Sequence, residues 1–122
     1  MNNNNIFEEI KRLNFEDFLW IVFIFLSIMN IYGDYNEKEF LKTNRKSFKD
    51  SANSIFELTI IVTFLIYIYF FVRNYNALEK ATEEQKNLYT IKLLGSSLLI
   101  AGVLCLLYFQ RKQRDFVGSP AI

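Results

Sequence analysis

The sequence predicts an all-α membrane protein, with three transmembrane helices in an antiparallel up-down-up bundle and a short amphipathic helix before them. Two observations support this prediction. Three long stretches of the 122 residues carry no charge, and densely charged connectors join them. Ahead of the first stretch, apolar residues recur at the three- and four-residue spacing of a helix. A chain of this length holds one domain or at most two.

The charge-free runs set the predicted segments. They cover Phe18 to Gly33, Leu58 to Val72 and Leu93 to Gln110, and contain 16, 15 and 18 residues. A helix needs about 20 apolar residues to cross a bilayer, so tolerated neighbours extend each run. The predicted segments are an amphipathic segment at 1–14, transmembrane helices at 15–33, 55–73 and 92–110, a charged and partly helical connector at 34–54, a helical hairpin connector at 74–91, and a basic C-terminal tail at 111–122.

Two other folds fit these runs less well. A soluble bundle would place polar residues along one face of each helix, whereas these runs are apolar all round. The run LTIIVTFLIYIYFFV is rich in β-branched and aromatic residues, as strands are. It is long for a strand, however, and its apolar and polar residues do not alternate. Because backbone groups in lipid must be hydrogen-bonded internally, helices are favoured.

The N-terminal segment predicts a separate short helix. One helical face carries four apolar residues, Ile6, Phe7, Ile10 and Leu13. We expect this helix to lie in the membrane interface. Asn14 stands three residues before an aspartate, which is a pattern typical of a helix N-cap. The chain is therefore expected to turn near Asn14 and then enter the membrane.

Lysine and arginine residues predict the orientation, because cytoplasmic loops carry an excess of them. The first connector and the tail hold eight, whereas the N-terminal segment and the second connector hold six. We therefore expect a multi-pass protein of the cell membrane, with its N-terminus outside and its C-terminus in the cytoplasm. Six of the chain's cations are expected to act in topology, and they are Lys11, Arg12, Arg73, Arg111, Lys112 and Arg114.

Polar residues inside the first two runs predict how those helices pack. At about 1.5 Å per residue, Ser27 and Thr63 lie at similar depth in an antiparallel pair, so they would face each other. By the same argument Asn30 would face Thr59. Tyr67 continues the face of Thr59 and Thr63, because the three are spaced four residues apart.

A hairpin near Thr82 would bring the last helix against that same face. Its small residues, four apart, would approach Tyr67, Thr63 and Thr59 in turn. The full set forms a predicted packing seam of Ser27, Asn30, Thr59, Thr63, Tyr67, Ser97, Ala101 and Cys105. The opposite side of the last helix would face lipid through Leu99, Val103 and Leu106. We favour helix packing over a permeation path, because no charged residue lies deep in any run.

Composition argues against several kinds of site. The net charge of +1 gives no reason to expect a nucleic acid partner. The chain has no histidine and a single cysteine, Cys105, and it shows no phosphate-binding glycine loop. We therefore expect no catalytic, cofactor-binding or metal site, and no enzyme. An interfacial site of acidic residues and tyrosine is the one enzymatic arrangement left open.

Two function classes remain for such a chain. The first is an accessory or interaction subunit in a bacterial-type inner membrane, surrounded by the lipid bilayer and bound to a membrane-protein partner or a second copy. The second is an oligomeric pore. The three spans, the outside N-terminus and the basic tail resemble the three-span phage holins in outline, although no shared motif carries the resemblance.

Overall fold

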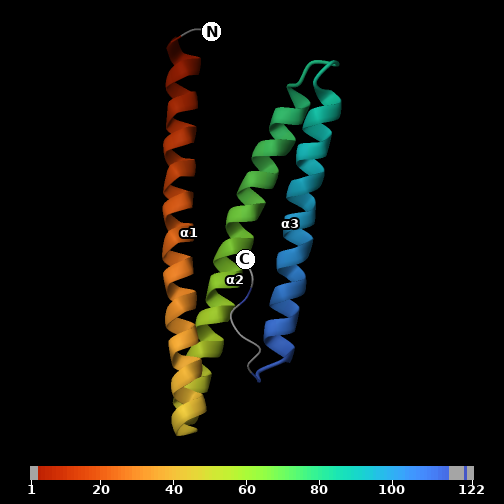
Figure 1. Ribbon diagram of the computed structural model, residues 1–122. Coiled ribbons are helices and arrows are strands. Elements are labelled where there is room, and N and C mark those ends of the chain that lie inside the picture. Colours follow the sequence, from red (N-terminus) through yellow and green to blue (C-terminus); the bar gives the residue numbers. More distant parts are fainter. Residues whose placement is uncertain (1–2, 116–119, 121–122) are drawn as a thin grey trace.

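Three long helices make up the computed structural model, which describes residues 3–115 and residue 120. They are α1 (Asn3–Thr43), α2 (Lys46–Glu79) and α3 (Lys86–Lys112), shown in Figure 1. No strand occurs in the described part of the chain, so the all-helical prediction is confirmed there. Each helix is long and apolar enough to cross a membrane. Positions 116–119, 121 and 122 of the predicted tail lie outside the described residues.

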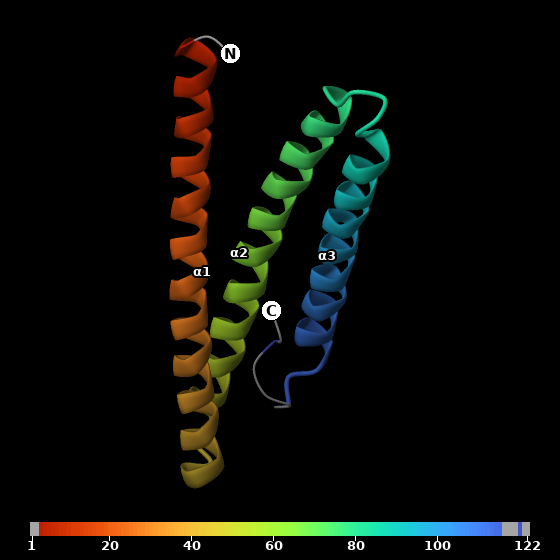
Figure 2. The ribbon, with the colours of Figure 1, turned by 45° about the horizontal axis from the view of Figure 1, so that its top comes forward.

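Helix α2 lies between the other two helices in both views (Figures 1 and 2). It contacts α1 along one side and α3 along the other, whereas α1 and α3 do not contact each other within the described residues. The helices therefore form an open layer with α2 in the middle, not a closed bundle. Consecutive helices run in opposite directions (Figure 1).

The N-terminal segment is not a separate helix, because α1 is continuous from Asn3 to Thr43. The predicted turn near Asn14 is therefore wrong. Two ion pairs of Arg12 support the continuous helix: Arg12 pairs with Glu9 one turn earlier and, across position 14, with Glu16 one turn later at 3.6 Å. Such pairs stabilise a helix at three- and four-residue spacing, and no glycine or proline interrupts the segment.

Two short turns connect the helices. Asn44 has a φ of 58°, and its amide donates to the Phe40 carbonyl at 2.7 Å, which closes α1. Asparagine tolerates this left-handed conformation better than most residues. Arg45 is extended and α2 begins at the next residue, so most of the first connector is helical. Residues 80–85 form the second turn, between α2 and α3.

The contact between α1 and α2 follows a seven-residue repeat. Leu19, Leu26 and Gly33 of α1 are buried at this spacing. Leu19 and Leu26 form an apolar cluster with Ile66 of α2. Gly33 marks a close approach of α1 to α2, because a Cβ atom placed there would overlap the Phe56 ring. The absence of a side chain at Gly33 therefore lets the two helix backbones come together.

Replacing Gly33 with leucine should force α1 away from Phe56. We expect the purified protein to lose about 1–3 kcal/mol of unfolding free energy, as is typical of overpacked contacts. Thermal unfolding in detergent micelles measures this loss. Gly102→Leu is the matched control, because a Cβ at Gly102 meets no atom within 4 Å. Equal stability of the two variants would contradict the close approach.

Candidate functional site

The predicted packing seam is present between α1 and α2 only in part. The structure brings Asn30 and Thr59 together, and the Thr59 hydroxyl donates to the Asn30 side-chain oxygen at 3.0 Å. Ser27 and Thr63 are not paired with each other. The Ser27 side chain is exposed and donates to the Phe23 carbonyl, while Thr63 is buried and donates to the Thr59 carbonyl.

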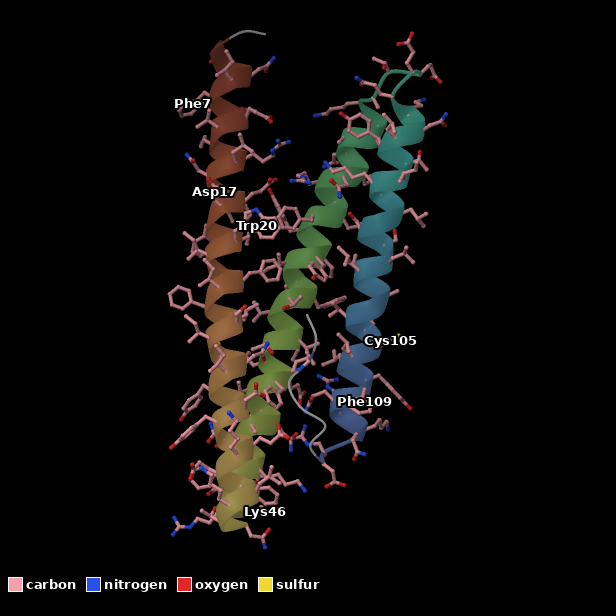
Figure 3. All side chains as sticks on the ribbon, viewed as in Figure 1. Phe7, Asp17, Trp20, Lys46, Cys105 and Phe109 are labelled. Atoms are coloured by element: carbon pink, nitrogen blue, oxygen red, sulfur yellow. The ribbon has the colours of Figure 1, made fainter. Side chains whose placement is uncertain are left out.

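Helix α3 turns a different face toward α2 than the predicted one. Ala101 and Cys105 are exposed, and Cys105 lies on the side of α3 away from α2 (Figure 3). Ser97 is half-buried and donates to the Leu93 carbonyl within its own helix. The buried positions of α3 repeat every seven residues instead, at Ser96, Val103 and Gln110. The prediction that Val103 faces lipid is therefore wrong.

Polar pairs at both ends of α3 explain this rotation. Gln110 donates to the Asn53 side-chain oxygen at 3.0 Å, and Asn74 donates to the Ser96 hydroxyl. Asn53 and Asn74 lie outside the charge-free run of α2, so an argument confined to the runs could not include them. Because both amides are buried, leaving either unpaired would cost free energy. The hydrogen bonds of these two amides therefore determine which face of α3 contacts α2.

Glutamates pair with most of the cations that the sequence assigned to topology. Glu57 of α2 accepts from Arg111 at 3.0 Å and from Arg114 at 3.3 Å. The Arg73 guanidinium donates to Glu16 of α1 at 2.7 Å. The remaining two, Lys11 and Lys112, lie over aromatic rings of Phe7 and Tyr108. Glu16 lies just before the first charge-free run, and Glu57 lies just before the second. These positions were the sequence signal for the interhelical ion pairs.

Glu16 is the centre of a hydrogen-bond network that reaches all three helices. Its side chain is almost fully buried, and it accepts from Arg73 and, at 3.2 Å, from the Tyr69 hydroxyl of α2. Arg73 also donates to the Asn74 side-chain oxygen at 3.1 Å and 3.3 Å. Asn74 continues to Ser96 of α3. We call these five residues the Glu16 network.

An apolar groove lies beside this network. Its volume is about 420 Å³. Trp20 of α1 points toward α2 (Figure 3), with its ring 5.6 Å from that of Phe70. The other apolar or aromatic side chains of the walls are Phe23, Tyr67, Phe70 and Leu99. The polar end is formed by three residues of the Glu16 network, which are Arg73, Asn74 and Ser96. The groove is therefore amphiphilic, with its polar atoms gathered at one end.

A cleft lined largely by charged and amide side chains, the polar cleft, lies beyond the Glu16 network. Figure 1 shows α1 diverging from α2 at this end. The cleft has a volume of about 660 Å³, and residues of α1, of the end of α2 and of the start of α3 line it. Arg12, Arg73 and Lys80 supply positive charge to it, and Glu9 supplies negative charge. Arg73 lines both this cleft and the apolar groove. The two spaces therefore meet at one guanidinium.

The charged, amide and hydroxyl side chains that line these spaces can donate hydrogen bonds to a bound molecule or accept them from it. In the described residues, no group of three or more histidine, cysteine or acidic side chains is placed to hold a metal ion. Every buried side-chain nitrogen or oxygen described has a hydrogen-bond partner. Comparisons with family models, with curated proteins and with solved structures found no match to this chain. The site must therefore be interpreted from its own residues.

Cysteine pairs would test the contacts between the helices. In a Cys105→Ala background, the pair Asn30→Cys and Thr59→Cys should form a disulfide on mild oxidation in membranes. Their native side chains are hydrogen-bonded, which is consistent with the Cβ separation that a disulfide needs. Thr59→Cys with native Cys105 should not crosslink, because Cys105 faces away from α2. Crosslinking of the second pair but not the first would contradict the observed rotation. Non-reducing electrophoresis separates the outcomes.

Removing the Glu16 carboxylate should destabilise the packing of α1. Glu16→Ala leaves Arg73 without its interhelical partner, and we expect a loss of about 3 kcal/mol of unfolding free energy. Thermal unfolding of the purified protein measures it. The exposed Glu8 on the same helix provides the control Glu8→Ala, which should change stability by less than about 0.5 kcal/mol. The double variant Glu16→Arg, Arg73→Glu exchanges the two charges, and we expect it to be more stable than Glu16→Ala.

Proposed function

We propose that this chain is an integral membrane protein that works as an interaction subunit of a membrane complex. In this proposal α1, α2 and α3 cross the bilayer up, down and up, with the N-terminus outside and the C-terminus in the cytoplasm. The three long apolar helices support the membrane placement. One observation supports the interaction role: the first turns of α1 carry an exposed apolar stripe that the rest of the chain does not cover.

The length of α1 places this stripe beyond the apolar run. A helix of 41 residues is about 60 Å long, whereas the hydrocarbon core is about 30 Å thick. Residues 3–14 precede the predicted transmembrane segment at 15–33, so they would extend past the hydrocarbon as a continuation of α1. Figure 1 shows this part of α1 diverging from α2. It is therefore accessible to another protein.

The two faces of this extension differ in polarity. Toward the cleft it presents Glu9 and Arg12. The other side carries exposed apolar residues, and the Phe7 side chain, which is 62% exposed, points away from α2 (Figure 3). The apolar stripe consists of Ile6, Phe7, Ile10 and Leu13. Because an apolar stripe at helical spacing is the usual contact face of an amphipathic helix, its partner should carry a matching apolar groove or helix.

An oligomeric pore has less support than an interaction subunit. A pore needs polar groups that are free to line a water path. Here the buried polar side chains of the described residues are paired, as Asn30 is with Thr59 and Asn53 with Gln110. Depolarisation of cells on expression would favour the pore, and a membrane-potential dye detects it.

A photoreactive amino acid at position 7 should capture the partner in native membranes. We expect one additional product, whose mass identifies a single different protein. Ile10→Asp should reduce its yield about tenfold, because the charge would be buried unpaired in the contact. Asn4→Asp, at an exposed polar position of the same helix, should leave the yield unchanged.

Two other products would count against this role. A crosslinked dimer of the chain would show self-association through the stripe. A yield that does not respond to Ile10→Asp would show an accidental contact. As an internal control, a photoreactive residue at position 9 should react within the chain, since Glu9 lines the cleft with Lys80.

Thiol labelling would test the proposed topology. In a Cys105→Ala background, Thr82→Cys in the second turn should react with a membrane-impermeant maleimide on intact cells. Thr43→Cys, at the end of α1, should react only after the membrane is opened. The reverse pattern would show the opposite orientation. Reaction of both positions on intact cells would contradict the three spans.

A further inference from the structure

We propose that the apolar groove and the polar cleft together form a binding site for one anionic phospholipid. This inference goes beyond the interaction role, because it concerns a different surface, and it rests only on the membrane placement proposed above. The acyl chain would occupy the groove between α1 and α3. The phosphate would lie in the cleft, near Arg73 and Lys80.

The arrangement of the two spaces matches the shape of an amphiphile. The walls of the groove come from the charge-free runs, as Trp20, Tyr67 and Leu99 show. The cleft is lined by residues beyond those runs, including Lys80, Gln85 and Tyr89. An apolar space inside the bilayer thus continues into a polar space at headgroup depth. Aromatic and charged residues usually lie at that depth in membrane proteins.

The groove must be filled by something apolar. Helices α1 and α3 do not contact each other in the described part of the chain, so neither closes it over α2. In a bilayer, the neighbouring lipid chains are available at high concentration to occupy such a space. The polar end of the groove distinguishes one kind of lipid from the rest.

Charge at that polar end favours an anionic headgroup. Three cations, Arg12, Arg73 and Lys80, line the cleft beside one carboxylate, Glu9. Glu16 pairs with Arg12 and Arg73, and Glu8 borders an adjoining hollow with Lys80. Lys80 makes no ion pair within the described residues and lines the cleft. Arg73 uses three of its five N–H donors for Glu16 and Asn74. Basic pockets between membrane helices bind lipid phosphates in this way.

Trp20 allows a direct test, because it is the single tryptophan and lines the groove. The full chain is reconstituted in phosphatidylcholine vesicles that contain an equal fraction of either brominated phosphatidylglycerol or brominated phosphatidylcholine. Bromine quenches tryptophan fluorescence on contact. We expect the anionic lipid to quench with an apparent affinity about two- to fivefold higher than the zwitterionic lipid.

Matched variants locate the effect. Lys80→Ala should bring the ratio of the two affinities close to one, whereas Lys86→Ala should preserve it. Lys86 is the appropriate control because it lies in the same hairpin and already pairs with Glu83 at 3.0 Å. Leu99→Phe should reduce quenching by the anionic lipid by filling the groove. Leu98→Phe, at an exposed neighbouring position, should not.

Three outcomes would overturn the inference. Equal quenching by the two lipids in the unchanged chain would show that no headgroup is selected. An unchanged preference in Lys80→Ala would show that selection occurs elsewhere. Loss of the preference on adding inorganic phosphate at constant ionic strength would show a site for free phosphate instead of a phospholipid.

A failure of the membrane placement can be told apart from these. If Trp20 does not enter the bilayer, neither brominated lipid will quench it. Quenching by brominated phosphatidylcholine alone is thus the control for insertion, and the ratio of the two lipids reports the site. The variants of the apolar stripe at Phe7 and Ile10 should leave this ratio unchanged.

Discussion

The buried Glu16 carboxylate determines how the three helices are held together at the end where they diverge. Helices α1 and α3 do not contact each other, so α2 must connect them. Glu16 reaches Arg73 of α2, and Arg73 leads through Asn74 to Ser96 of α3. Because charged hydrogen bonds are strong when shielded from water, this network sets the point at which α1 leaves α2. The apolar groove and the polar cleft both depend on that point.

The buried polar side chains in the described part of the chain serve mainly to join the helices. Asn30 with Thr59, Asn53 with Gln110, and the Glu16 network account for the buried polar contacts between helices. What is left for other molecules is the outer surface: the apolar stripe at the start of α1, and the amphiphilic space where α1 and α2 separate. Both are binding surfaces, and they differ in the partners that their chemistry suits.

The sequence allowed the number and the type of the helices to be predicted, because the charge-free runs are long and helix is favoured for them. The positions of the polar residues along the first two runs also predicted that Asn30 faces Thr59. The two side chains are hydrogen-bonded to each other. The face that α3 presents to α2 differs from the predicted one. The prediction treated the small residues as the contact face, whereas the buried amides outside the runs, Asn53 and Asn74, determine the rotation of that helix.

The sequence by itself determined how many helices there are and which part of each is apolar, since charged residues bound each apolar run and no knowledge of neighbours is needed. Only the tertiary structure decided that α3 turns Val103 inward and that α1 and α3 stay apart. These features depend on which partner each polar group finds across a helix contact. Hydrogen bonds and ion pairs of this kind join residues about 30 to 60 positions apart, so local patterns cannot specify them.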